Sequence, residues 1–286
     1  MAQSFPGLAV RGIGCDLVVM GTLLKILSVL VALYAVAVIV MALAQGALLF
    51  PRWAMGGSPP LPSSAVELRL ERPGGVVLAG HLLPGTREDA PLLLGFGGNA
   101  WDGAAMVLFL RQVFPEHDVA AFHYRGYAPS TGRPSARALL EDSVAVHDHL
   151  AEGRAVVAVG FSVGAGPAAH LAQARALQGV LLVTAFDSLE GLARGHYPWA
   201  PVRWLLRHRM EPAADLAASG VPVALISAER DTIIPRARTQ ALREALAGTA
   251  PGIVFDRVVA GGHNDIYARS ELADAMRAAL LVLEED

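Results

Sequence analysis

Short apolar runs recur along residues 66–286 and set the pattern of most of this chain. Residues 66–70 alternate between apolar and polar positions, and residues 76–82 alternate again after a turn at Pro73-Gly74-Gly75. Alternation of this kind predicts strands with one face in water, and the short turn predicts an antiparallel hairpin. Further runs of strand length lie at residues 91–96, 119–122 and 156–159, which are apolar throughout, and at residues 180–184, 222–227 and 253–259, which are mainly apolar.

Continuously apolar runs of this length are typical of strands that are covered on both faces. Helical patterns separate most of them, notably at residues 236–247 and 270–283. Strands that alternate with helices predict βαβ units and a mainly parallel, doubly covered sheet. The expected fold class is therefore α/β, opening with an antiparallel hairpin. Ligand groups should gather beyond the carboxyl ends of the parallel strands.

The N-terminal part of the chain differs, with no charged residue between positions 26 and 50. A helix of this length would measure roughly 37 Å, enough to cross a hydrocarbon layer of about 30 Å. We expect a tail without regular structure at its start (1–25), a transmembrane helix (26–50) and a linker rich in Pro, Gly and Ser (51–65). A cleaved signal peptide, with Lys25 as its charged start, and a buried core helix are the alternatives.

Few charges set the expected orientation of this helix. Arg11 and Lys25 precede the apolar stretch, and Arg52 follows it with Trp53, as interface anchors do. The excess of positive charge before the helix places the N-terminus in the cytoplasm. The expected protein is a single-pass membrane protein whose folded domain faces the periplasm or the outside.

Composition narrows the classes of partner. The chain carries a formal net charge of −3 and has no basic block, so nothing favours nucleic acid. Lys25 is its only lysine, and basic character from arginine with abundant alanine and glycine suggests a GC-rich bacterial source. Its one cysteine, Cys15, excludes an internal disulfide and a cysteine-based zinc cluster. His147 and His149 do not share a helix face, and no metal or cofactor is implied.

The most informative stretch for chemistry is Gly160-Phe161-Ser162-Val163-Gly164, between a predicted strand and a helix of small residues. This pattern predicts a nucleophile elbow, a sharp turn that exposes the serine hydroxyl in a strained backbone conformation. Side chains at Gly160 and Gly164 would collide where the helix packs back on the strand. Ser162 is therefore the candidate nucleophile, and a glycine-rich turn with an idle serine is the alternative.

A serine hydroxyl needs a base within hydrogen-bond reach, and the base needs an acid that orients it. In this type of fold, acid and base follow the serine along the chain. Asp231 follows the strand at residues 222–227, and His263 follows the last predicted strand, so they are the candidate acid and base. Asp187 also follows a strand and is the alternative acid. Asp265 lies too close to His263 in sequence and is expected to bind its own loop.

Negative charge that develops on a substrate oxygen needs backbone N–H donors, an oxyanion hole. The N–H of Val163 is one candidate, because it follows the nucleophile at a helix N-terminus, where the helix dipole favours negative charge. The N–H of Asn99 is the other, since Gly97 and Gly98 allow that loop to approach a substrate closely. A simple turn of the chain is the alternative explanation for these glycines.

Together these motifs resemble the α/β-hydrolase superfamily, and within it the membrane-anchored serine hydrolases similar to the eukaryotic depalmitoylase-like α/β-hydrolase-domain proteins. The segments that carry the resemblance extend over residues 66–286 and are 96–100, 124–127 with Ser130 and Gly132, 160–164, 186–188, 230–235 and 262–265. The resemblance implies the α/β-hydrolase fold over residues 66–286. One departure is Gly97, where the family usually has histidine.

The function expected from these residues is hydrolysis of a carboxylic ester or thioester through an acyl-enzyme on Ser162. A serine peptidase of the prolyl-oligopeptidase type, which would normally carry a large propeller domain, and a non-catalytic membrane-tethered binding module are the alternatives. A short cap is expected at about residues 187–220, where an apolar stripe edged with arginine would hold an acyl chain or touch anionic headgroups. A helix packed on the sheet with solvated charges is the alternative there.

Overall fold

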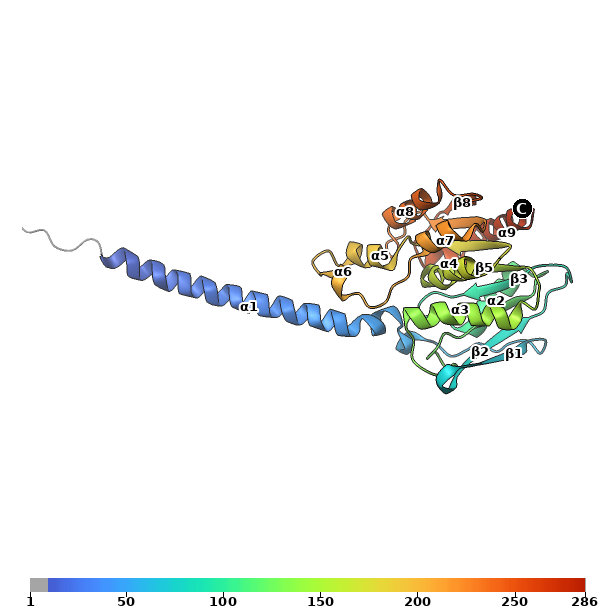
Figure 1. Ribbon diagram of the computed structural model, residues 1–286, viewed down its shortest axis with the longest axis horizontal. Coiled ribbons are helices and arrows are strands. Elements are labelled where there is room, and N and C mark those ends of the chain that lie inside the picture. The colour runs from blue at the N-terminus through green and yellow to red at the C-terminus, as the bar shows by residue number, and fades with distance from the viewer. Residues whose placement is uncertain (1–9, 286) are drawn as a thin grey trace, which may run out of the picture. The chain divides into compact units, whose positions relative to one another are not determined.

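The computed structural model of the protein describes residues 10–285, with side chains from residue 18 onward. The chain divides into two compact units, Met1–Gln45 and Gly46–Asp286. The described part of the first unit is most of one long helix, and the second unit holds the sheet with its helices (Figure 1). What the sequence predicts for residues 1–9 lies outside the described residues.

Helix α1 (Val10–Leu49) is longer than the pattern predicted. The expected tail at residues 1–25 is wrong from Val10 onward, because the apolar sequence also continues before Ile26 and its one lysine is a good helix former. Within the described residues, the stretch Val18–Leu49, with mean hydropathy 2.9, is long and apolar enough to cross a membrane by length and composition. None of its most apolar part is buried, which argues against a core helix and leaves both the anchor and the signal peptide.

The second unit is built on one eight-stranded sheet in the order β1-β2-β4-β3-β5-β6-β7-β8. β1 (Val66–Arg72) and β2 (Val76–Leu83) form the expected antiparallel hairpin, and β2 also pairs antiparallel with β4. All other neighbours in the sheet are parallel. These strands are β3 (Leu92–Phe96), β4 (Val119–Phe122), β5 (Val156–Phe161), β6 (Gly179–Val183), β7 (Val223–Ala228) and β8 (Ile253–Val259). The expected fold class is confirmed.

Helices cover both faces of the sheet. They are α2 (Gly103–Val113), α3 (Ala136–Leu150), α4 (Ala165–Ala174), α7 (Pro212–Ser219), α8 (Arg236–Leu246) and α9 (Ser270–Glu285). A first apolar cluster joins α2 and α9 to one face, and a second joins α3, α4, α7 and α8 to the other. Leu93 belongs to the first cluster, whereas Leu92 and Leu94 belong to the second. Because successive residues face opposite helix layers, the central strands β3, β5 and β6 are buried and apolar at every position.

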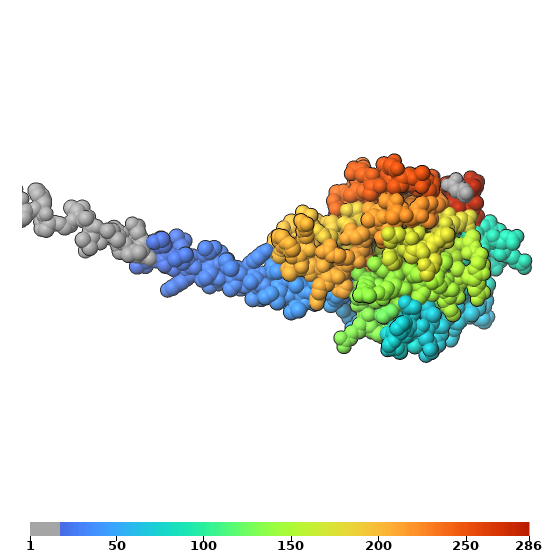
Figure 2. Space-filling view, in the orientation of Figure 1, coloured from blue at the N-terminus to red at the C-terminus, as the bar shows by residue number. Residues whose placement is uncertain are grey.

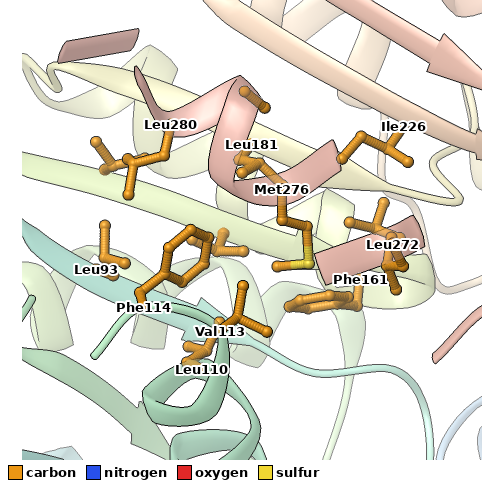
Figure 3. Close-up of a cluster of buried hydrophobic side chains, with 14 of the residues drawn as sticks. Leu93, Leu110, Val113, Phe114, Phe161, Leu181, Ile226, Leu272, Met276 and Leu280 are labelled. Atoms are coloured by element: carbon orange, nitrogen blue, oxygen red, sulfur yellow. The ribbon is translucent and has the colours of Figure 1, made fainter. Parts of the chain in front are cut away.

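Figure 3 shows the first cluster, where α9 lies against the sheet. Leu272, Met276 and Leu280 are spaced four residues apart on one face of α9, and they lie close to Leu181 and Phe161 of the sheet. All five side chains are at most 3% exposed. Phe161 directly precedes the candidate nucleophile, so the packing of α9 also fixes the strand that carries it.

Residues 51–65 are not the free linker that their composition predicts. Met55 packs with a third apolar cluster, and Leu61 packs against the first. The hydroxyl of Ser58 donates a 2.7 Å hydrogen bond to the carboxylate of Asp102 at the start of α2. The apolar residues spaced among the prolines therefore hold this segment along the surface of the second unit.

The segment expected as a cap, residues 187–220, contains α5 (Leu189–His196), α6 (Val202–Leu205) and α7. Leu216 of α7 is buried in the second cluster, so α7 belongs to the scaffold and the cap is residues 189–210. Figure 1 shows α5 and α6 projecting beyond the end of the sheet. Leu189, Leu192 and Met210 of the cap are buried in the third apolar cluster, which also contains Phe50 and Val163.

Candidate active site

Ser162 lies directly after β5, in the middle of the sheet, and begins a short 3-10 turn that leads into α4. Its φ of +51° is in the left-handed region, which costs a residue with a side chain about 1–3 kcal/mol. A Cβ on Gly160 would lie 2.7 Å from the oxygen of Gly164, and a Cβ on Gly164 would overlap the carbonyl of Phe96. The backbone thus has the geometry of a nucleophile elbow, and close packing requires its glycines.

The structure brings the imidazole of His263 to this serine. His263 lies in the loop after β8, and its Nε2 is 3.1 Å from Ser162 Oγ. Both side chains are buried. A neutral imidazole whose Nε2 carries no hydrogen can accept the serine proton at this distance.

Asp231, in the loop after β7, holds the other side of the imidazole. Its Oδ2 is 2.8 Å from His263 Nδ1. Its Oδ1 accepts backbone hydrogen bonds from Ile233 at 2.9 Å and from Ile234 at 2.7 Å, which fix the plane of the carboxylate. An acceptor at Nδ1 favours the tautomer that has its hydrogen on Nδ1, and Nε2 is then free to face the serine.

The two other acids singled out in the sequence bind elsewhere. The Oδ2 of Asp187 accepts hydrogen bonds from Arg238 and from Ser188 Oγ, both at 3.2 Å. The Oδ2 of Asp265 accepts the backbone N–H of Gly262 at 3.3 Å, so Asp265 binds its own loop as expected. The geometry therefore favours Asp231 over Asp187 as the partner of the imidazole.

The loop after β3 lies against the elbow, and two tyrosines hold it there. Gly98 approaches so closely that a Cβ on it would lie 3.8 Å from Ser162 Cβ. The hydroxyl of Tyr124 donates to the oxygen of Gly97 at 2.7 Å, and the hydroxyl of Tyr127 donates to the oxygen of Asn99 at 2.6 Å. Burial raises the pKa of both phenols, so both remain protonated donors.

The sequence indicates these tyrosines only as part of a family resemblance and does not show their contacts with the loop after β3. The available signal was their position, directly after β4, since β4 is the parallel neighbour of β3. Val163, the other expected donor, follows Ser162 in the 3-10 turn and is buried in the third cluster.

Aromatic side chains pack around Ser162 and His263. Trp101 packs on Phe161 with ring centroids 5.0 Å apart and on Tyr267 at 5.2 Å. The Tyr267 ring meets the His263 ring edge to face at 6.4 Å, and its hydroxyl is 3.1 Å from Thr184 Oγ1. Burial raises the pKa of Tyr267 to about 12. Tyr267 thus packs beside the imidazole as an uncharged ring, a contact that the sequence did not indicate.

The cap contacts the loop of the candidate acid directly. His196, at the end of α5, donates from Nε2 to the backbone oxygen of Ile233 at 2.8 Å. Ile233 also donates its N–H to Asp231, so this loop is held from both sides. The same side of the molecule therefore carries the acid, the base and the cap.

A cluster of polar side chains away from Ser162 and His263 consists of His81, His123 and Asp102. The Nδ1 of His123 is 3.4 Å from Asp102 Oδ2, and the two imidazole rings meet edge to face at 5.7 Å. Burial lowers the pKa of both histidines, although the charge of Asp102 partly offsets it. Among the side chains that the structure describes, no group of three or more His, Cys, Asp or Glu is placed to hold a metal ion.

Comparison with known sequences places the chain in a family. No family model matches it. An uncharacterized protein of Mycobacterium tuberculosis, in strains CDC 1551 and H37Rv, is 31% identical over 221 residues, covering 72% of this chain and 77% of that protein. The chain belongs to the family of this mycobacterial protein.

Solved structures show which fold this family member has. An esterase from Pyrococcus furiosus is similar with a TM-score of 0.59 and 16% identity, over 81% of this chain and 96% of the esterase. The α/β hydrolase GrgF from Penicillium is similar with a TM-score of 0.58 and 15% identity, over 79% of this chain and 99% of GrgF. The protein therefore has the α/β-hydrolase fold.

Proposed function

We propose that this α/β-hydrolase-fold protein is a membrane-anchored serine hydrolase that cleaves carboxylic esters or thioesters of acyl groups. The observation that carries the proposal is the unbroken line of contacts from Ser162 through His263 to Asp231, at 3.1 and 2.8 Å. The likeness to an esterase over most of both chains is consistent with this class of reaction.

In the proposed mechanism, His263 acts first as a base. Its Nε2 removes the proton from Ser162 Oγ as the oxygen attacks the carbonyl carbon of the substrate. Asp231 holds the imidazole and stabilises the imidazolium that forms. His263 then returns the proton to the departing alcohol or thiol, which leaves an acyl-enzyme. Water, activated by the same imidazole, releases the acid and restores the serine.

The oxyanion of each tetrahedral intermediate would be bound by the N–H groups of Val163 and Asn99. Val163 is positioned by the elbow, and Asn99 is positioned by a loop whose peptide oxygens are held by tyrosine hydroxyls. A donor that is fixed before the reaction stabilises charge without reorganisation, and loss of one such donor typically costs about 10²–10³ in rate. Gly97, where the resembled family usually has histidine, leaves this backbone support in place.

Labelling with a fluorophosphonate probe tests the nucleophile. The full chain should be labelled and should hydrolyse short-chain p-nitrophenyl esters or acyl thioesters. Ser162→Ala should abolish labelling and lower the rate at least about 10³-fold. Ser270→Ala, at an exposed serine of α9, is the matched control and should behave as wild type. Unchanged hydrolysis by Ser162→Ala would refute the mechanism, and an unlabelled, inactive wild type would favour a binding module.

The anchoring part of the proposal is supported by the apolar helix Val18–Leu49 and by the flanking basic residues. We expect the protein to resist alkaline extraction from membranes and its folded domain to be digested by protease added to spheroplasts. N-terminal sequencing of the mature protein separates the anchor from a signal peptide, because Ala42-Leu43-Ala44 has the small residues of a signal-peptide cleavage site and cleavage there would remove the anchor.

A further inference from the structure

The cap exposes large aromatic side chains that a water-soluble surface rarely carries side by side. Trp204 of α6 is 81% exposed, and Trp199, before α6, is 46% exposed. The same segment also exposes arginines: Arg203 precedes Trp204 on α6, and Arg194 is on α5. These four residues are called the cap surface below. Figure 2 shows the cap segment, in yellow to orange, at the surface of the domain.

The charge of the cap is opposite to that of the chain. Residues 189–210 contain four arginines and one glutamate, Glu190, which gives a formal charge of +3, whereas the whole chain carries −3. Arg209 pairs with Glu190 at 2.8 Å, so the acidic residue is occupied within the cap itself. Tryptophan beside arginine is the combination that binds the headgroup region of an anionic bilayer.

The cap packs against Gly46 and Phe50, which lie at the start of the second unit. The ring of His208 meets the ring of Phe50 edge to face at 5.3 Å, and a Cβ on Gly46 would lie 3.5 Å from His208 Nε2. Phe50 and Met210 share the third cluster. Since Phe50 directly follows the end of α1, the cap is fixed close to the point where the apolar helix ends. Trp53, a few residues further on, is 84% exposed.

We propose that the cap surface docks on an anionic lipid bilayer. The third cluster contains cap residues, Phe50 and Val163, the residue after the candidate nucleophile, so docking of the cap would bring Ser162 toward the lipid surface. Resting on the proposed function, the substrate class is then an acyl lipid that enters from the bilayer. A protein partner is the competing occupant, and the experiment below separates the two.

A fluorophore at the cap tests docking without using catalysis. In the full chain, Cys15→Ser/Trp204→Cys is labelled with an environment-sensitive maleimide and reconstituted in nanodiscs of phosphatidylcholine or of phosphatidylcholine with phosphatidylglycerol. The emission should shift to the blue and be quenched by brominated lipid in the anionic discs. Cys15→Ser/Leu281→Cys, at a 59% exposed leucine of α9, is the control and should show neither effect.

The contribution of positive charge to docking is tested by replacing arginines of the cap surface with glutamine. Arg194→Gln/Arg203→Gln should weaken the anionic-lipid response by about fivefold for each arginine. Arg69→Gln/Arg257→Gln removes the same charge from the two edge strands and should leave the response unchanged. A solvent-like cap label in anionic discs, or an equal response in neutral discs, would overturn the proposal; the first result would leave a protein partner as the occupant of the cap surface.

Enzyme kinetics test whether docking promotes hydrolysis of a substrate that is held in the bilayer. Arg194→Gln/Arg203→Gln should lower the rate on an acyl lipid held in anionic discs relative to the rate on a soluble short-chain ester. Equal rate ratios in this variant and in wild type would overturn the assignment of the substrate class. Failure of wild type to hydrolyse either substrate would count against the proposed function alone, because the fluorescence measurement is still decisive for docking.

Discussion

The hydroxyl of Tyr127 donates a 2.6 Å hydrogen bond to the backbone oxygen of Asn99. Tyr127 is buried, and it comes from the loop after β4, whereas Asn99 lies in the loop after β3. The bond therefore connects the loops of two neighbouring parallel strands beside the candidate nucleophile. Its effect is to hold one peptide unit of the oxyanion loop in a fixed orientation.

Removal of this hydroxyl should loosen the oxyanion loop. Tyr127→Phe removes the donor that holds the Asn99 peptide in place, so kcat on a soluble ester should fall about tenfold or more while KM changes little. Tyr197→Phe makes the same atomic change in the cap and is the control. Steady-state kinetics of both variants provide the measurement, and an unchanged kcat for Tyr127→Phe would show that the loop holds itself.

The identity of the acid can be tested by two isosteric changes. Asp231→Asn replaces the acceptor of His263 Nδ1 and should favour the wrong tautomer, with kcat lower by about 10³–10⁴-fold. Asp187→Asn should retain most of the activity, because its carboxylate pairs with Arg238. Rates are compared after circular dichroism has shown that both variants are folded. The reverse ranking would make Asp187 the functional acid.

Close packing at the elbow predicts a sharp difference between two glycines. Gly164→Ala places a Cβ against the carbonyl of Phe96, so the variant should lose activity and unfold at a lower temperature. Gly195→Ala, on α5, meets no atom within 4 Å and should be neutral or more stable by about 0.4–1 kcal/mol. Thermal unfolding and ester hydrolysis measure both effects. A stable, active Gly164→Ala would contradict the close approach of the two loops.

Stability should fall in mild acid because of His81 and His123. Burial lowers their folded-state pKa below the unfolded value of about 6.5. As the pH falls through 6.5, the unfolded chain takes up protons before the folded one does, so the free energy of unfolding decreases until the pH reaches the folded pKa values. Urea unfolding between about pH 7.5 and 5 measures this slope.

Replacement of one of these histidines should make the free energy of unfolding depend less on pH. His81→Gln removes a group that resists protonation in the folded state, so its free energy of unfolding should vary less with pH than that of wild type. His149→Gln, at an exposed histidine of α3, should keep the wild-type slope. Equal slopes in all three proteins would assign the acid sensitivity to other groups.

The scaffold could be predicted because its signals are local. The run at residues 91–96 became β3 (Leu92–Phe96), and the apolar pattern before Ser162 became β5, since both faces of these strands are covered. The relative order of Ser162, Asp231 and His263, each directly after a strand, was also readable from the chain. Parallel strands then bring their carboxyl ends to one edge without further information.

The parts that could not be predicted depend on contacts between distant segments. Tyr127 reaches Asn99 only because β3 and β4 are neighbours in the sheet, an adjacency that composition does not encode. Leu61 is an isolated apolar residue in a segment whose composition predicts a linker, yet it packs against the first apolar cluster. The start of α1 at Val10 could not be predicted, because Gly12 and Gly14 interrupt the apolar pattern there.

The hydrogen bond from His196 to Ile233 has a consequence for engineering. Cap segments are attractive targets for exchange when a new specificity is wanted, since they lie outside the scaffold. In this protein a transplanted cap would also withdraw the donor that steadies the loop of Asp231. A chimaera designed on this chain should therefore retain His196 or supply another donor at its place, so that selectivity can be altered independently of turnover.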